Sequence, residues 1–441
     1  MSRRAFHTGL YEEHCEELAA MYDARRAHLD DWESTPEEFA DLESRMEAHL
    51  DGLVLGGALA LATARAQATP DDAASLHVLL TLACRLDRAD LVESALDELA
   101  AACGDPDTDE EDAAAVRAAA ADALCHHLPA HWTALLIAAL ERGDPHVVPV
   151  AAACAGFGRH PCGEAIARAF AGACADLVPL LRALGRLPGA GPASLLAHID
   201  DPRHEIAVEA ALAALRGGQA EAMPAVQRAW PAAWTAVPLA LSAGPAMCPR
   251  LCEAAATGGT REALVALGLL GDPAGVDALL AALDDPQRAH AAALGLYLLT
   301  GAGREETTVA PEEAERDDDD DDDAAASWLG SPAAGITVDR EAWSRWMRSH
   351  RAQLRPGVRH RLGAPASPQR DLEVLATFVG PLRLRRCLVD EWVIRHGVRS
   401  DLEPDMLVDR RVTALARVQA SLVDAARLAP GGWYFHGRVV R

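Results

Sequence analysis

The chain has 441 residues, half of them hydrophobic, and a formal net charge of −25. This length and composition predict a folded protein with a large core or two to three domains. It contains no lysine, so all 41 basic residues are arginine, which excludes phosphate loops of the G-K-[ST] type, Schiff-base chemistry and Ser-x-x-Lys nucleophiles.

The N-terminal residues predict neither export nor membrane insertion. The longest apolar run there, residues 53–64, has twelve residues, too few to cross a hydrocarbon core of about 30 Å. Met1-Ser2-Arg3-Arg4 is followed by no apolar segment of the signal-peptide kind. We therefore expect a cytoplasmic protein.

Residues 1–104 are predicted to form an N-terminal helical region, and residues 105–302 a series of HEAT-like repeats. Residues 261–301 read as apolar helices hinged at Gly271-Asp272-Pro273 and Asp284-Asp285-Pro286. Proline suits a helix start because the first N–H has no partner within the helix. The spacings between Pro145, Pro202, Pro231 and Pro286 are 57, 29 and 55 residues, which a period of about 28 to 29 residues fits.

The spacing of apolar residues within these segments is helical, and alanine and leucine dominate. We therefore predict an all-α protein, a right-handed α-solenoid of HEAT-like helix pairs. One such pair cannot bury its own apolar face, so neighbours must stack on both sides and leave a curved surface suited to binding.

Cysteine and histidine offer two weak candidates for a metal site. Cys248 and Cys252 are one helical turn apart, and packing in the core is the competing interpretation. Cys125, His126, His127 and His131 form the other cluster, which requires a helix that continues through Pro129. Because no C-x-x-C occurs and proline breaks helices, we predict reduced core thiols, no metal and no cofactor.

The segment 303–337 is predicted to be an acidic disordered insert. It holds seven consecutive aspartates, Asp317 to Asp323, whose mutual repulsion opposes folding. A solubilising spacer, a specific binding motif and a segment that lies against the following arginines are all compatible with it.

Residues 338–441 are predicted to be a basic helical region that resumes the solenoid, with 19 arginines against 11 acidic residues. Trp343 and Trp346 are either core anchors or a ligand platform. The following arginines, Arg359, Arg361, Arg383, Arg385 and Arg386, are predicted to form a basic binding surface for an acidic partner or for the aspartate run. The alternative is ordinary surface arginine paired with Asp371, Asp390 and Glu391.

Sequence patterns at both ends resemble a family of uncharacterised bacterial HEAT-repeat proteins of the PBS-lyase-HEAT-like type. The N-terminal pattern is HCEELAAMYDARRAHLDD followed by FADLESRMEAHLDGLVLGG, and the C-terminal pattern is W-x-x-W with G-x-R-x-x-L-G-x-P. The residues that match are His14, Glu16, Glu17, Arg25, His49, Leu50, Asp51, Gly52, Leu53, Trp343, Trp346, Gly357, Arg359, Gly363 and Pro365. Members are sometimes encoded near type VI secretion components, so the resemblance implies an accessory or adaptor role; the acidic insert departs from the family pattern.

Three functional classes follow. The first is a non-catalytic scaffold or adaptor that binds a protein partner along the solenoid. The second is a nucleic-acid-binding HEAT-like solenoid, which the net negative charge opposes. The third is an enzyme such as a bilin-attaching lyase, for which shared repeats are only an analogy of fold.

Overall fold

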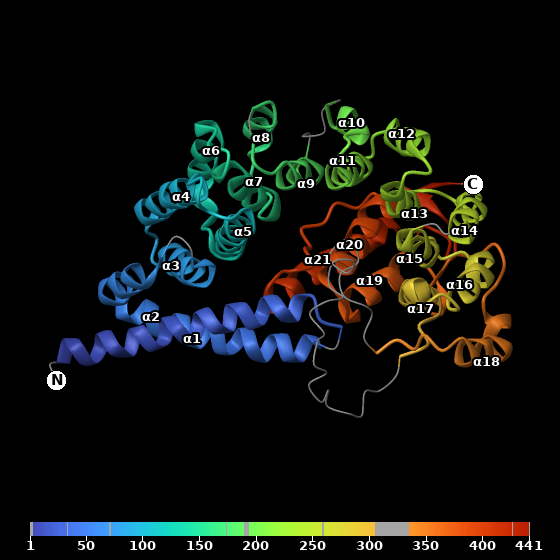
Figure 1. The fold of residues 1–441 in the computed structure, drawn as a ribbon, viewed down its shortest axis with the longest axis horizontal. Coiled ribbons are helices and arrows are strands. Elements are labelled where there is room, and N and C mark those ends of the chain that lie inside the picture. The colour runs from blue at the N-terminus through green and yellow to red at the C-terminus, as the bar shows by residue number, and fades with distance from the viewer. Residues whose placement is uncertain are drawn as a thin grey trace. The chain divides into compact units, whose positions relative to one another are not determined.

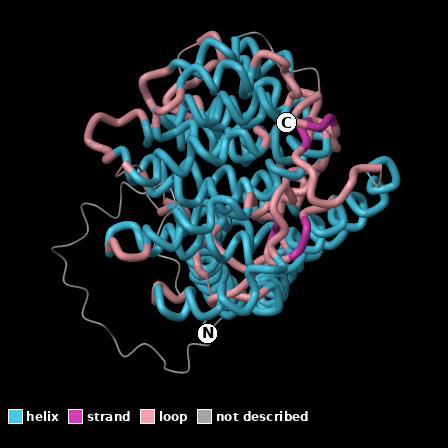
Figure 2. Tube along the Cα trace, turned by 90° about the vertical axis from the view of Figure 1, so that its right-hand side faces the viewer, coloured by secondary structure: helices cyan, strands magenta, loops and turns pink. Residues whose placement is uncertain are grey.

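The computed structural model describes residues 3–32, 34–69, 72–172, 174–188, 194–257, 260–304, 335–425 and 427–440. These ranges hold twenty-one α-helices and only two antiparallel pairs of two-residue strands, which confirms the predicted all-α class (Figure 1, Figure 2). Most of the predicted acidic insert, including Asp317 to Asp323, lies outside the described residues, so its predicted disorder stays a prediction.

The chain divides into two compact units. The first comprises residues 1–29, 35–195 and 406–411, and the second comprises residues 30–34, 196–405 and 412–441. No helix in the described part of the chain has both the length and the apolar character needed to cross a membrane.

In the first unit, alternate helices contact one another in succession: α1 with α3, α3 with α5, α5 with α7 and α7 with α9. The helices α4, α6 and α8 lie along one side of this row (Figure 1). The helices are α1 (Arg3–Leu29), α2 (Pro36–Gln67), α3 (Ala73–Arg85), α4 (Ala89–Cys103), α5 (Glu110–His127), α6 (Thr133–Arg142), α7 (Val147–Phe157), α8 (Gly163–Ala169) and α9 (Val178–Arg186). The short α10 (Ser194–Ala197) spans the division between the units.

In the second unit, α11, α13, α15 and α17 form a similar row, which we call the main row, with α12, α14 and α16 packed beside it. These helices are α11 (His204–Arg216), α12 (Ala222–Ala229), α13 (Ala236–Ser242), α14 (Cys248–Ala256), α15 (Arg261–Leu270), α16 (Val276–Ala282) and α17 (Pro286–Thr300). Residues after 335 pack against the row: α20 contacts α11 and α13, and β1 contacts α17.

The later elements are α18 (Arg340–His350), β1 (His360–Arg361), β2 (Ala364–Pro365), α19 (Pro368–Thr377), α20 (Leu382–His396), α21 (Val408–Ala425), β3 (Tyr434–Phe435) and β4 (Arg438–Val439). In the first hairpin His360 pairs with Pro365, and in the second Tyr434 pairs with Val439. An isolated antiparallel bridge joins Arg304 to Ile336, so the two described ends of the acidic insert lie side by side.

Local sequence signals explain where several helices begin and end. Asp285 caps α17 by accepting a hydrogen bond from the backbone of Gln287, and Pro286 is its first residue. Pro145 and Pro202 stand two residues before their helices, in the preceding turn. α5 ends at His127, before Pro129, as the sequence predicts.

Small residues let the helices of the main row approach closely. A Cβ atom added at Gly268 of α15 would lie 2.5 Å from the carbonyl oxygen of Gly295 of α17. Only glycine fits at this crossing.

Candidate functional site

The arginines predicted to form a basic surface do not lie together on one. Arg359 and Arg361 are 1% and 0% exposed, and Arg385 is also buried. Arg383 is exposed and Arg386 is half-buried. The surface interpretation is therefore wrong for Arg359, Arg361 and Arg385, because a buried arginine is stable when paired and these face carboxylates or carbonyl groups within the unit.

The first hairpin brings two of these arginines onto one face. Arg359 and Arg361 are two residues apart in extended chain, so their side chains point the same way. Leu362 and Gly363 turn the chain with φ values of 45° and 80°. The hairpin thereby directs both guanidinium groups toward α20.

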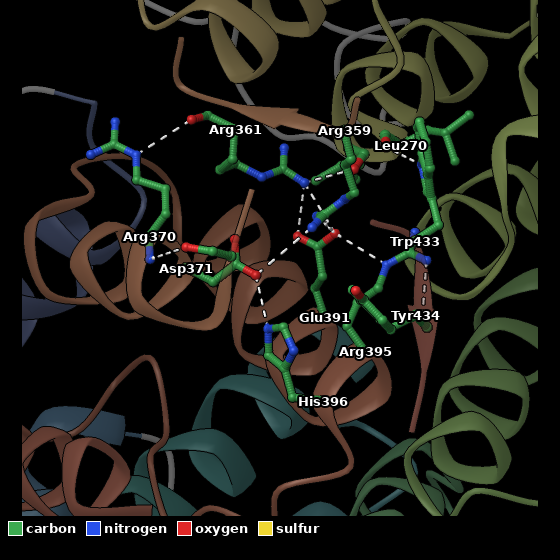
Figure 3. A network of polar contacts seen from close by, with 12 residues as sticks. Leu270, Arg359, Arg361, Arg370, Asp371, Glu391, Arg395, His396, Trp433 and Tyr434 are labelled. Atoms are coloured by element: carbon green, nitrogen blue, oxygen red, sulfur yellow. Dashed lines mark hydrogen bonds and ion pairs between the residues drawn. The ribbon is translucent and has the colours of Figure 1, made fainter. Parts of the chain in front are cut away.

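Glu391 of α20 is the centre of a buried ionic cluster. Its carboxylate accepts two hydrogen bonds from Nη2 of Arg361, at 2.8 and 3.1 Å, and a further one from Arg359. Nε of Arg395, one helical turn along α20, lies 3.7 Å from the same carboxylate. Figure 3 shows the three guanidinium groups converging on Glu391.

Asp371 of α19 is the second carboxylate of the cluster. It lies 3.8 Å from Nη1 of Arg359 and 2.9 Å from Nε2 of His396 (Figure 3). Burial raises the pKa of Asp371, but the hydrogen bond from His396 and the charge of Arg359 outweigh it, and the pKa falls to about 2. The carboxylate is therefore ionised at neutral pH.

The arginines of the cluster also bind the ends of helices in the main row. Arg361 donates to the carbonyls of Gly268 and Leu269 in α15, at 3.0 and 2.6 Å. Arg395 donates to Ala240 and Ala243 at the end of α13, at 2.6 and 2.8 Å. A cation at a helix C-terminus is favourable because the carbonyl ends carry partial negative charge.

Other residues of the C-terminal region also donate hydrogen bonds to the ends of main-row helices. Trp433 donates to Leu270 of α15 at 3.1 Å, and His436 donates to Leu215 of α11 at 2.7 Å. The amides of Leu362 and Gly363 donate to Leu298 and Leu299 of α17, at 2.9 and 3.0 Å. Residues after 358 therefore supply hydrogen bonds to the C-terminal ends of all four helices of the main row.

This arrangement is structural in character. Burial lowers the pKa of Arg361 and brings that of Arg395 to about 9, with Glu391 opposing both shifts, so both remain charged at neutral pH. Three guanidinium groups meet two carboxylates, and the helix carbonyls take up the remaining positive charge. The cluster fastens the C-terminal region to the main row and presents no reactive group to solvent.

Sequence reasoning found part of this cluster. It paired the arginines with Asp371 and Glu391, but as exposed pairs. It missed Arg395 and His396, although Arg395 stands one turn after Glu391 in LVDEWVIRHG. A pair of opposite charges at that spacing in a predicted helix was the available signal.

The two predicted tryptophans have different surroundings. Trp343 is buried, and its Nε1 donates to the carbonyl of Thr337 at 2.7 Å. Trp346 is half-buried and stacks on His350, with ring centroids 4.4 Å apart. The core interpretation therefore holds for Trp343.

The candidate metal ligands do not come together in a group of three or more. The Sγ atoms of Cys248 and Cys252 lie 4.0 Å apart, and Cys248 is buried. His131 lies beyond the end of α5, where its Nε2 is 3.1 Å from Asp87. Within the described ranges, no group of three or more His, Cys, Asp or Glu side chains could hold a metal ion.

Two histidines from the quoted family pattern do meet in the first unit. Nδ1 of His14 on α1 lies 3.1 Å from Nδ1 of His49 on α2. A Cβ atom added at Gly52 would lie 3.1 Å from the ring of His14. These residues shape the crossing of α1 with α2.

The first unit also contains a cavity of about 660 Å³ that sequence reasoning missed. Residues of α1, α2, α3 and α5 line it together with the segment 407–410, and its polar lining is Glu43, Ser44, Glu47, Asp51, His77, Thr81, Arg85, His127, Asp409 and Arg410. A partial signal was present, because His77 and Thr81 are one turn apart in an otherwise apolar helix.

No protein-family model, curated protein or solved structure matches this chain.

Proposed function

We propose that this protein is a non-catalytic scaffold or adaptor that binds a protein partner. In this proposal both units are right-handed α-solenoids of HEAT-like helix pairs. The successive contacts of alternate helices in each unit support it, since stacked pairs produce that pattern. The proposed setting is the cytoplasm.

The main support for partner binding is apolar surface on the N-terminal helix pair. Leu55 of α2 is 89% exposed, Phe6 of α1 is 55% exposed, and Leu10 one turn further along α1 is also exposed. Tyr11 packs against Gly56 where the two helices cross. Contiguous exposed apolar patches are characteristic of interaction surfaces, and in this proposal Phe6, Leu10 and Leu55 belong to one such patch.

The resemblance to bacterial HEAT-repeat proteins supports a more specific proposal, an accessory role near type VI secretion or in effector handling. Nucleic-acid binding is the alternative, and it loses support from the structure. Arg359, Arg361 and Arg385 are buried and hydrogen-bonded inside the second unit. Contacts with phosphate groups require accessible arginines.

Affinity capture from the cell that produces the protein tests the proposal. The full chain and the variant Phe6→Ser/Leu55→Ser serve as baits, and mass spectrometry quantifies what each recovers. Val439→Ser is the matched control, because Val439 on β4 is 67% exposed and belongs to the second unit. We expect the double variant to lose a partner that the control retains.

Secretion-apparatus or effector proteins among the lost partners would support the adaptor proposal. Equal recovery by all three baits would contradict a role for the N-terminal helix pair. Recovery of nucleic acid that disappears at high salt would favour the alternative instead.

A further inference from the structure

Two residues that line the cavity of the first unit, His77 and Thr81, have buried polar atoms without a hydrogen-bond partner in the described chain. His77 of α3 is 4% exposed, and its ring makes no hydrogen bond with any described residue. It stacks on Tyr22 of α1, with centroids 3.9 Å apart and planes at 16°. Burying a polar group without a partner is unfavourable, so the position calls for an external one.

Thr81 is the second of these residues, and it differs from other threonines in helices of this chain. Its hydroxyl, one turn after His77, is buried and makes no hydrogen bond within the described chain. Other threonines in helices donate to the carbonyl four residues back: Thr63 to Leu59 at 3.0 Å and Thr300 to Leu296 at 2.6 Å. Thr81 does not make this local bond, and its hydroxyl is unpartnered in a residue that lines the cavity.

The carboxylates around the cavity already have partners. Glu43 accepts from Nε of Arg25 at 2.8 Å and from the amide of Val408 at 2.6 Å. Arg85 binds Glu47 at 2.7 Å and Asp51 at 3.3 Å. Asp409 at the rim also has an interaction of its own.

One guanidinium of the lining, that of the exposed Arg410, has no such partner in the described chain. Arg410 lines the cavity and makes no hydrogen bond or ion pair with a described residue. Burial lowers the pKa of His127 to about 3, and the charges acting on it, those of Arg410, Arg85 and Arg25, all lower it further. His77 and His127 are therefore uncharged hydrogen-bonding groups at neutral pH.

We propose that this cavity is a binding site for a small molecule that carries an oxyanion, a carboxylate or a phosphate group. The guanidinium of Arg410 supplies charge, and the Thr81 hydroxyl and the N–H groups of His77 and His127 supply donors. Arginine suits both anions because its planar fork matches two oxygens. None of the residues that line the cavity belongs to the exposed apolar surface proposed to bind a protein.

Calorimetry and thermal unfolding of the full chain test this inference, with inorganic phosphate and citrate as probes and sodium chloride of equal ionic strength as the reference. We expect one of the two probes to bind and to raise Tm. Thr81→Val and Arg410→Gln should each weaken that binding about tenfold, the factor expected for one lost hydrogen bond to a charged group. Binding of phosphate alone would identify a phosphorylated ligand, and binding of citrate alone a carboxylate.

Thr63→Val is the matched control, because its hydroxyl is satisfied inside the protein and does not line the cavity. It should bind the probe as the unmodified chain does and have a lower Tm without ligand. Thr81→Val should keep its Tm without ligand, since no hydrogen bond is lost. Absence of binding by both probes, or equal affinity of the unmodified chain and the two cavity variants, would overturn the inference.

Discussion

Nη2 of Arg361 donates to both carboxylate oxygens of Glu391, at 3.1 and 2.8 Å, in the interior of the second unit. The same guanidinium donates to two carbonyls at the end of α15. Arg361 therefore joins three separate parts of the chain: the β1 hairpin, α20 and the main row. Arg359 and Arg361, which the sequence predicted to lie on a binding surface, are instead internal connections.

Replacing Glu391 should strongly destabilise the second unit. Glu391→Gln removes the negative charge that faces Arg359, Arg361 and Arg395 and leaves three guanidinium groups with Asp371 alone. Breaking a buried ion pair typically costs about 3 to 5 kcal/mol. Urea unfolding followed by circular dichroism measures the loss.

The control for this substitution is Glu373→Gln. Glu373 forms a half-exposed pair with Arg370 on α19, at 3.3 Å, and such pairs contribute about 0 to 1 kcal/mol. If Glu391→Gln changed the free energy of unfolding no more than Glu373→Gln does, the cluster would not hold the C-terminal region in place.

Gly268→Ala should destabilise the protein even though alanine favours helix. The added methyl group would meet the backbone of Gly295 at 2.5 to 2.9 Å, where nothing flexible can move aside. Separating α15 from α17 should outweigh the gain of about 0.5 to 1 kcal/mol that alanine brings to a helix. Thermal unfolding should show a lower Tm.

Gly9→Ala provides the opposite case. Gly9 lies within α1, and no atom outside its local helix lies within 4 Å of an added Cβ, so this variant should be stabilised by about 0.5 to 1 kcal/mol. A stabilising Gly268→Ala would show that the two helices do not cross as closely as described.

Acid should destabilise the first unit through its buried histidines. Burial and nearby arginines lower the pKa of His127 to about 3 and that of His77 well below its usual value. The unfolded chain binds protons first, so stability is fully present above about pH 6.5 and falls as the pH drops toward 3. His127 alone should account for a loss of about 2 kcal/mol between pH 8 and pH 5.

The variant His127→Gln isolates this contribution. Urea unfolding at pH 8 and pH 5 should show a smaller pH-dependent loss for the variant than for the unmodified chain. Identical losses would mean that His127 is protonated in the folded protein as readily as in the unfolded one.

Features set by neighbouring residues could be predicted from the sequence. The Asp285-Pro286 start of α17 and the break before Pro129 both follow from short-range rules. Burial in the core was one of the two interpretations that the sequence allowed for Trp343.

Features set by tertiary contacts could not be predicted. Arg359 and Arg361 look like surface residues until Glu391, some thirty residues later, is placed beside them. The cavity depends on segment 407–410 meeting α2 and α3, more than 300 residues earlier in the chain. Neither relationship leaves a periodic pattern in the sequence.

Amide hydrogen exchange of the full chain tests most directly whether the C-terminal region is fastened to the main row. The amide of His360 donates to Gly271 at 2.8 Å, and those of Leu362 and Gly363 donate to α17. We predict that these three amides exchange as slowly as those inside α15 and α17, and that Glu391→Gln accelerates them. Exchange at the rate of Arg399, in the loop after α20, would contradict the account.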